Sequence, residues 1–311
     1  MRVFVYQGYY PAGGTYMAYH VGRILHQFFG CEVYCVGERP ADSLFHYAVD
    51  LPAVSESDFL QRCGADDLLL CNPSFSSLQF GLRLPCRKLS YIQGIRTFAV
   101  LDVCYDHYVF VSEWARRFVA DYYGIDGRVI PAFVGDDFLL PAPEWQRRKP
   151  VFVTSRRKYE DIQFRKLQAV YAAKYGGADI PCEVLPILPQ PELADRFRGS
   201  RYYLSLDAME GFGLPMLEAM ASGCAVAGWD SGGNREYAVQ GQNALLARYG
   251  DFEGLAEHIH TLLNDEAGAC MLAAAGAATA RRFDALRFEE GWVAELSRYL
   301  GKVPLNRPVV P

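Results

Sequence analysis

A short glycine-rich turn in the second half of the chain carries residue types that bind anions. Gly211 and Gly213 bracket Phe212, directly before a helical pattern that Pro215 opens and Gly223 ends. Proline at the first helical position loses no hydrogen bond, and glycine is a usual stop after the last turn. The free N–H groups and the positive dipole end of such a helix attract negative charge. This turn is therefore a candidate phosphate site.

Two carboxylates accompany the turn: Glu210 precedes it, and Glu218 lies about one turn inside the helix. Taken singly, each could be a solvated surface acid. A carboxylate beside a phosphate is unfavourable unless it serves a neutral part of the ligand, and in nucleotide sites an acidic residue accepts hydrogen bonds from ribose hydroxyls. The pair therefore predicts a nucleotide-diphosphate pocket whose carboxylates hold hydroxyl groups.

The elements that must position these residues alternate between strands and helices along the whole chain. Continuous apolar runs, rich in β-branched and aromatic residues, are typical of parallel strands buried on both faces. Their alternation with helical patterns through both halves predicts an α/β protein of two doubly wound, Rossmann-like domains. The expected strands are 3–8, 32–37, 67–71, 88–93, 107–112, 128–133, 150–155, 182–187, 201–206, 224–229 and 243–247. The clearest expected helices are 14–29, 113–123, 162–175, 215–222 and 252–264.

The stretch 139–149 has two prolines, many polar residues and no hydrophobic period, which predicts a hinge. It would separate an N-terminal domain of residues 1–138 from a C-terminal domain of residues 150–283. The last helical pattern, 284–300, carries one apolar stripe, and its polar face lacks the strong basic character of interfacial helices. We therefore expect 284–311 to form a C-terminal helix and tail that pack back on the N-terminal domain.

Composition excludes several classes of protein. The 311 residues are 51% hydrophobic and 22% charged, and the net charge of −5 argues against a global electrostatic grip on nucleic acid. No apolar run reaches the roughly 18 residues of a membrane span, and the chain starts directly on a strand pattern without a signal peptide. Nine cysteines without a C-x-x-C pair indicate reduced thiols. These features predict a cytoplasmic protein.

Other catalytic motifs are missing from the sequence. No D-x-D sequence supplies a metal clamp for a diphosphate, and no H-E-x-x-H, G-x-S-x-G or Walker P-loop occurs. His258 and His260 lie two residues apart on a helical pattern and point in different directions, so a shared metal is not expected. The first strand-to-helix turn lacks G-x-G-x-x-G, which argues against a nicotinamide dehydrogenase.

The segment 210–218, EGFGLPMLE, resembles the E-x7-E signature of retaining GT-B glycosyltransferases of glycosyltransferase family 4. The resemblance continues through 219–223, 232–237, 243–246 and 251–264, so it covers the second half. The LSL before the signature and the GG-x-REY after it are similar to a subset that includes bacterial rhamnosyl- and hexosyltransferases of surface glycans. Three residues of the GG-x-REY motif could have a functional role or could equally be turn and capping residues: Gly232, Gly233 and Glu236.

The resemblance implies a GT-B architecture with the donor site in the C-terminal domain and the acceptor site in the N-terminal domain. Glu218 would accept hydrogen bonds from the ribose hydroxyls, and Glu210 would hold the donor sugar. The backbone of the turn would hold sugar and phosphates through Gly211, Phe212, Gly213 and Leu214. In the first half, Tyr9–Thr15 resembles the glycine loop that follows the first strand in these enzymes, and this implies donor-binding roles for Gly13 and Gly14.

A basic segment, TSRRK at 154–158, follows the first expected strand of the second domain. The family commonly carries an Arg and a Lys there for the donor pyrophosphate, and Arg157 and Lys158 fit best, with Arg156 as the alternative to Arg157. Their fixed charges would stabilise the departing diphosphate in the transition state. The sequence departs from the family at 91–94, where Tyr-Ile-Gln-Gly replaces the stretch with a histidine near the donor sugar.

The resemblance implies a retaining transferase that moves a hexose or deoxyhexose from a nucleotide diphosphate sugar to a glycan, a lipid-linked glycan or another hydroxyl acceptor in bacterial polysaccharide, lipopolysaccharide or glycoconjugate synthesis. We expect no cofactor, no metal, no nucleic-acid partner and at most peripheral contact with the inner face of the membrane. Two alternatives stay open. One is a nucleotide-sugar epimerase of GT-B fold, and the other is an inactive sugar-nucleotide-binding subunit of a glycan assembly complex.

Overall fold

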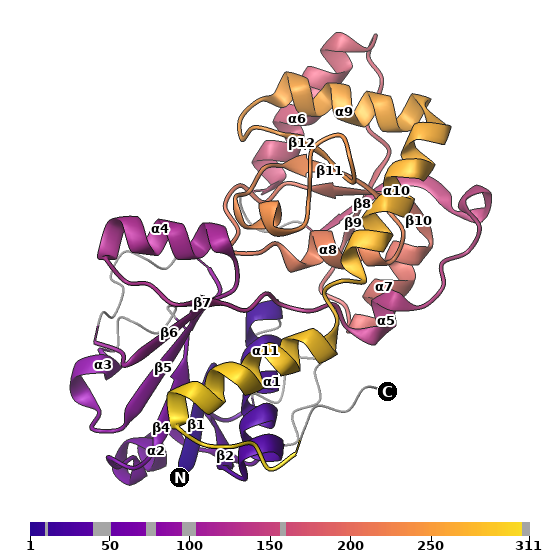
Figure 1. The fold of residues 1–311 in the computed structure, drawn as a ribbon. Helices are drawn as coiled ribbons and strands as arrows, with labels where there is room; N and C mark the ends of the chain where they lie inside the picture. Colours follow the sequence, from indigo (N-terminus) through magenta and orange to yellow (C-terminus); the bar gives the residue numbers. More distant parts are fainter. Residues whose placement is uncertain (10–11, 40–50, 73–78, 95–103, 156–159, 307–311) are drawn as a thin grey trace. The chain divides into compact units, whose positions relative to one another are not determined.

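The computed structural model describes residues 1–9, 12–39, 51–72, 79–94, 104–155 and 160–306 (Figure 1). The chain divides into two compact units. The first is Met1–Ala132 together with Ala285–Pro311, and the second is Phe133–Asp284. Each unit is built on a parallel sheet with helices on its faces, which confirms the predicted α/β architecture. Among the described residues, no helix combines the length and the hydropathy that crossing a bilayer requires.

The sheet of the first unit has the strand order β3-β2-β1-β4-β5-β6-β7, and the pairings between these strands are parallel. Val3, Phe4 and Val5 of the central strand are fully buried, which is why its apolar run is continuous and not alternating. The strands are β1 Arg2–Tyr6, β2 Glu32–Val36, β3 Ala53–Val54, β4 Leu68–Cys71, β5 Arg87–Ile92, β6 His107–Phe110 and β7 Arg128–Val129. The helices are α1 Gly13–Phe29, α2 Glu56–Arg62, α3 Phe80–Arg83, α4 Glu113–Tyr123 and α11 Ala285–Leu300.

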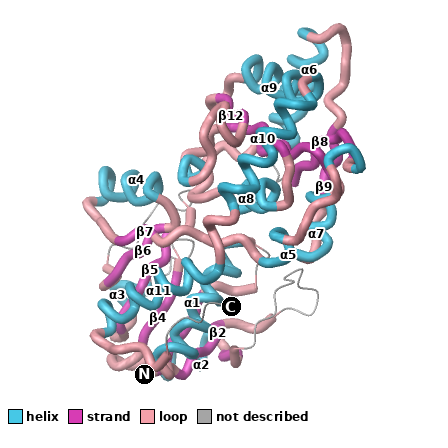
Figure 2. The backbone as a smooth tube through the Cα atoms, turned by 45° about the vertical axis from the view of Figure 1, so that its right-hand side comes forward, coloured by secondary structure: helices cyan, strands magenta, loops and turns pink. Residues whose placement is uncertain are grey.

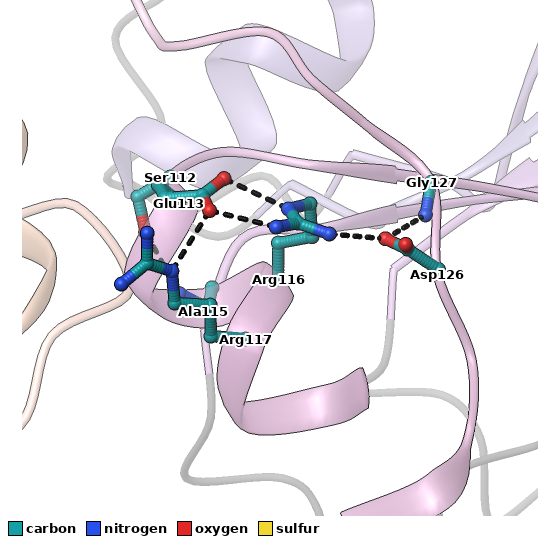
Figure 3. A network of polar contacts seen from close by, with 7 residues as sticks. All are labelled: Ser112, Glu113, Ala115, Arg116, Arg117, Asp126 and Gly127. Carbon is teal, nitrogen blue, oxygen red and sulfur yellow. Dashed lines mark hydrogen bonds and ion pairs between the residues drawn. The ribbon is translucent and has the colours of Figure 1, made fainter. Parts of the chain in front are cut away.

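Local sequence explains how α4 begins and how it is held. The hydroxyl of Ser112 accepts from the backbone N–H of Ala115 at 3.1 Å, which caps the helix. Arg116 then bridges two carboxylates, Glu113 at 2.7 Å and Asp126 at 2.6 Å (Figure 3). These contacts join the first turn of α4 to the loop that leads into β7.

The chain returns to the first unit at Ala285, where α11 packs against α1. Trp292 is fully buried, and its ring meets the edge of Tyr91 with centroids 4.9 Å apart. Glu295 is also fully buried, and its carboxylate contacts His107 at 2.6 Å and the guanidinium of Arg298. The helix is therefore anchored by apolar contacts and by ion pairs to one buried carboxylate.

The sheet of the second unit has the order β12-β11-β10-β8-β9 and is also parallel. Helices α6 and α9 pack together on one face, and α5, α7 and α8 pack together on the other (Figure 2). The strands are β8 Lys149–Ser155, β9 Cys182–Leu185, β10 Ser200–Ser205, β11 Ala225–Trp229 and β12 Leu245–Ala247. The helices are α5 Asp136–Leu139, α6 Glu160–Lys174, α7 Gln190–Arg198, α8 Leu214–Ala221, α9 Phe252–Asn264 and α10 Glu266–Ala280.

The boundary between the units differs from the predicted one. The stretch 139–149 lies inside the second unit, and the chain passes between units at Ala132–Phe133 and at Asp284–Ala285. The polar composition of 139–149 suggested a linker, but Trp145 is 8% exposed and packs against Tyr202 of β10. Trp145 therefore anchors this otherwise mostly exposed segment to the core of the second unit.

Arg148, in the same segment, is a buried cation: it is 5% exposed, and none of the described carboxylates pairs with it. Its guanidinium donates to the carbonyl groups of Phe197 at 3.0 Å, Ser222 at 3.2 Å and Gly223. These carbonyls lie at the C-terminal ends of α7 and α8, where a positive charge is favoured. Arg148 therefore ties two helix ends to the start of β8.

We expect Arg148→Met to lower the free energy of unfolding by on the order of 3 kcal/mol, because several buried carbonyl groups would lose a charged donor. The matched control is Arg147→Met. Arg147 is the neighbouring residue, its side chain is 78% exposed, and it pairs with Glu144 at 3.5 Å. Its loss should change stability by less than about 0.5 kcal/mol. Urea unfolding of both variants measures the difference, and equal losses would contradict the role of Arg148.

Candidate functional site

The predicted glycine turn lies between β10 and α8. Gly213 is the N-cap of α8, with a left-handed φ of 81°, and Pro215 stands in the first turn. The backbone N–H groups of Phe212, Gly213 and Leu214 donate to none of the residues that the structure describes. The first N–H groups of a helix have no partner within the helix. The turn therefore presents unpaired donors at the positive end of the α8 dipole.

A second glycine pair lies against this turn. The backbone N–H of Glu210 donates to the carbonyl of Ser231 at 3.1 Å, and the N–H of Gly233 donates back to the carbonyl of Glu210 at 3.0 Å. A Cβ atom at Gly233 would lie 2.2 Å from the carbonyl carbon of Gly211, so no other residue fits there without a shift. Gly232, with φ of 89°, makes the bend that allows this approach. The sequence left open whether these two glycines serve a ligand or form a turn. Their geometry supports the turn role.

Two side chains after this glycine pair complete the framework. Asn234 is fully buried, accepts from the N–H of Ser231 at 3.1 Å and donates to the carbonyl of Trp229 at 2.9 Å. The hydroxyl of Tyr237 donates to the carbonyl of Gly213 at 2.6 Å. Neither residue was predicted from the sequence to have a role. The available signal was their position directly after the glycine pair, where side chains must satisfy the loop's backbone groups.

Glu218 lies on α8, about one helical turn after the glycine turn, and is 5% exposed. Burial raises the pKa of its carboxyl to about 8. None of the described residues hydrogen-bonds this carboxyl, which is unusual for a buried acid. A ligand that supplies hydroxyl donors would satisfy it, as the sequence analysis expected of a ribose.

The turn gathers further carboxyl groups. Glu210 is half-buried and its backbone is fixed on both sides by the loop after β11. Asp207 lies in the loop after β10 that also contains Glu210, and it is 7% exposed. It was not among the predicted site residues. Burial raises the pKa of the Tyr237 hydroxyl well above its usual value, and Tyr203, Glu210, Asp207 and Glu218 add to the shift. Three acidic side chains therefore lie near the hydroxyl that contacts the candidate anion-binding turn.

The basic segment 154–158 is described only at its beginning. Thr154 is buried near the end of β8, and β8 pairs with β10, which leads into the turn. Parallel neighbours end at the same edge of a sheet. Arg156, Arg157 and Lys158 lie outside the described residues, so their roles stay predictions.

In the first unit, the predicted glycine turn forms the start of α1. Gly13 and Gly14 are its first residues, and the amide of Gln93 donates to the carbonyl of Gly14 at 2.9 Å. Gln93 thus fixes this turn from the end of β5, at the position where the sequence departs from the family. Gln7, at the end of β1, is 6% exposed, and its Oε1 has no hydrogen-bond donor among the described residues. Sequence reasoning missed both amides, although each is a polar residue closing an apolar run.

The two histidines of α9 do not converge, as their spacing predicted. His260 stacks on Tyr175 with ring centroids 3.8 Å apart, whereas Nε2 of His258 lies 3.3 Å from the carbonyl of Leu246. Within the described ranges there is no group of three or more His, Cys, Asp or Glu side chains placed to bind a metal ion. Metal independence stays a prediction.

The pKa of Glu218 predicts a distinctive effect of pH on stability. A carboxyl with a folded-state pKa of about 8 and an ordinary value of 4.5 keeps its proton in the native state when the unfolded chain has lost it. The free energy of unfolding should therefore fall as pH rises between these two values, by up to about 1.4 kcal/mol per pH unit. Glu218→Gln should remove this slope, so the variant gains stability over the native protein toward pH 8.

Urea unfolding at several pH values between 5 and 8.5 measures the slope. Glu113→Gln is the control with the opposite sign, because Arg116 and Arg117 hold the pKa of Glu113 at about 2. Its stabilising contribution is present above the ordinary value and is lost as pH falls, so this variant should be less stable than the native protein at neutral pH. Parallel curves for Glu218→Gln and the native protein would contradict the buried neutral carboxyl.

The sequence of the chain is similar to those of known glycosyltransferases. Residues 173–280 match the family model of glycosyl transferases group 1. A D-inositol 3-phosphate glycosyltransferase of Thermobispora bispora is 30% identical over 191 residues. These are 58% of this chain but 44% of that protein, so the chain matches less than half of the relative's length.

Solved structures extend the likeness across both units. One is HepE of Anabaena in complex with UDP and glucose, with a TM-score of 0.73 at 13% identity. The aligned residues cover 96% of this chain and 100% of the HepE chain. Sucrose-phosphate synthase from Thermosynechococcus elongatus has a TM-score of 0.65 at 14% identity and covers 97% of this chain and 99% of its own. The chain therefore has the GT-B fold of two Rossmann-like domains, and the match at residues 173–280 supports a glycosyltransferase.

Proposed function

We propose that the protein is a retaining glycosyltransferase of family 4. It transfers a hexose or deoxyhexose from a nucleotide diphosphate sugar to a glycan or another hydroxyl acceptor in bacterial polysaccharide, lipopolysaccharide or glycoconjugate synthesis. One observation carries the proposal: none of the described residues donates to the buried carboxyl of Glu218, which lies on the helix whose N-terminus presents the unpaired backbone N–H groups. A nucleotide diphosphate satisfies both features, since its ribose offers donors and its phosphates offer acceptors.

Each part of the donor has a proposed partner in the second unit. Glu218 accepts from the ribose hydroxyls, and Glu210 accepts from hydroxyls of the transferred sugar. The N–H groups of Phe212, Gly213 and Leu214 donate to the diphosphate. Fixed charges at Arg157 and Lys158 stabilise that diphosphate as it leaves.

The proposed transfer needs no protein nucleophile. The bond between the anomeric carbon and the diphosphate oxygen breaks while the acceptor oxygen bonds to the same carbon on the same face. The acceptor's hydroxyl proton passes to the departing phosphate oxygen. Anomeric configuration is then retained, and protein groups neutralise the charge without a metal ion.

The named neighbours support the ligand classes. HepE was solved with UDP and glucose, and another HepE structure with UDP-glucose. The Thermobispora relative is named for D-inositol 3-phosphate, and another similar structure is a trehalose 6-phosphate synthase from Burkholderia multivorans. Both named compounds carry hydroxyl groups. For this chain we propose a nucleotide-sugar donor and a glycan or lipid-linked glycan acceptor, used in the cytoplasm.

Above about pH 8, where the carboxyl of Glu218 is ionised, Glu218→Ala should weaken binding of the donor nucleotide about 10- to 150-fold, because a hydrogen bond to a charged group contributes roughly 1.5–3 kcal/mol. Glu257→Ala is the matched control, since Glu257 lies on α9 of the same unit with its side chain 58% exposed and paired to Lys174. Calorimetric titration with a panel of nucleoside diphosphates measures both variants. Unchanged affinity in a folded Glu218→Ala protein would remove the ribose assignment.

Transfer should continue in excess EDTA, and the product should keep the donor's anomeric configuration. Protein charges replace the bound cation that usually neutralises a departing diphosphate. NMR of the product linkage and a time course with EDTA provide the measurement. Activity that returns only with Mg²⁺ or Mn²⁺ would contradict metal independence, and an inverted linkage would contradict the family 4 mechanism. An epimerised nucleotide sugar, or binding without turnover, would favour one of the two alternative functions.

A further inference from the structure

The side chain of Tyr237 hydrogen-bonds to the backbone of the glycine turn. Its side chain is buried, and its hydroxyl donates to the carbonyl of Gly213 at 2.6 Å. The same carbonyl accepts from the N–H of Met216 at 3.1 Å, inside the first turn of α8. Gly213 stands at the N-cap in a left-handed conformation, so the turn depends on the most permissive residue type.

The position of the Tyr237 ring is fixed on several sides. Its edge contacts are with Phe212, at 5.3 Å between centroids, and with Phe283, at 6.0 Å. The backbone carbonyl of Phe283 accepts from the N–H of Val134 at 2.8 Å, so this ring belongs to a paired segment. The side-chain amide of Asn243 donates to the carbonyl of Tyr237 at 2.9 Å. The hydroxyl therefore reaches Gly213 from a side chain that has little freedom to move.

The hydrogen bond from Tyr237 to the carbonyl of Gly213 also determines where the next backbone N–H points, because a peptide unit is planar. The carbonyl of Gly213 and the N–H of Leu214 belong to one planar trans peptide unit and point in opposite directions. A hydroxyl that holds the carbonyl inward therefore directs the Leu214 N–H outward, away from Tyr237. Without that bond, only the longer contacts from the N–H groups of Met216 and Leu217 hold this carbonyl. The flexibility of Gly213 would then let the peptide unit tilt and turn the Leu214 N–H partly away from an anion.

We infer that Tyr237 is a positioning residue for the donor diphosphate, which acts by aiming the N–H of Leu214 at a phosphate oxygen. The inference rests on the proposed function, because the diphosphate is the ligand of that function. Tyr237 itself touches no part of the donor. Its removal should therefore affect the diphosphate and leave the nucleoside portion, which Glu218 holds, unaffected.

The decisive variant is Tyr237→Phe, which keeps the ring and its aromatic contacts and removes only the hydroxyl. The matched control is Tyr91→Phe in the first unit, because Tyr91 is also fully buried and its hydroxyl also donates to a backbone carbonyl, that of Ile130 at 2.9 Å. Both variants lose one buried hydrogen bond of the same kind, so their losses of stability should be similar. Only the first loses a bond to the turn.

Titration of each protein with UDP, GDP and dTDP, and with the corresponding nucleosides, separates the two parts of the ligand. Tyr237→Phe should bind its nucleoside diphosphate roughly 3- to 10-fold more weakly and its nucleoside with unchanged affinity. Tyr91→Phe should leave both affinities unchanged. Gly213→Ala is a second variant with the same expected pattern, because its Cβ would lie 3.0 Å from the Tyr237 hydroxyl and displace it.

The outcomes distinguish this inference from the proposal on which it rests. An unchanged ratio of diphosphate to nucleoside affinity in Tyr237→Phe would overturn the positioning role while the donor site stands. Equal weakening of both ligands would also overturn it, since that indicates a general structural effect. If the native protein binds none of the nucleoside diphosphates, the proposed function fails and this role fails with it.

Discussion

The geometry of the candidate site depends on one close approach of backbone to backbone, in which Gly233 packs directly against the turn at Glu210–Gly211. Gly228 of β11 makes a similar approach to Ser205 of β10, where a Cβ would lie 2.6 Å from the carbonyl oxygen. These two glycines let β11 and the loop after it lie directly on β10 and the turn after it. The turn's conformation is therefore imposed by the neighbouring loop through paired N–H and carbonyl groups, and α8 starts where that loop places it.

A second constraint is electrostatic. Acidic side chains gather beside the N–H groups that favour an anion, and Glu218 is buried there without a hydrogen bond from the described residues. Burial keeps this carboxyl protonated near neutral pH, which limits the charge repulsion among the neighbouring acidic side chains. A buried acid with a raised pKa and no internal partner is typical of a functional site, because such a group lowers the stability of the fold where no ligand supplies its partner.

Much of the fold could be predicted from the sequence. The continuous apolar runs of the expected strands correspond to β1, β2 and β4–β12, because strands buried on both faces have few polar positions. The two-residue strand β3 and the helix α10 were not predicted, since the first is too short and the second is rich in Ala and Gly without a hydrophobic period. The hinge was misplaced because Trp145 and Arg148 are buried by residues distant in sequence, which composition does not reveal.

The sequence by itself determined the features that short-range chemistry controls: the glycine turn, the proline that starts α8 and the spacing of Glu210 and Glu218. Only the tertiary structure decided which groups those features meet. Tyr237 reaches Gly213 across 24 residues, and Gln93 reaches Gly14 across 79. The protonation of Glu218 likewise follows from burial by the whole unit. Local propensities act over one helical turn or one strand, whereas contacts of this kind exist only after the sheet has brought distant strand ends to one edge.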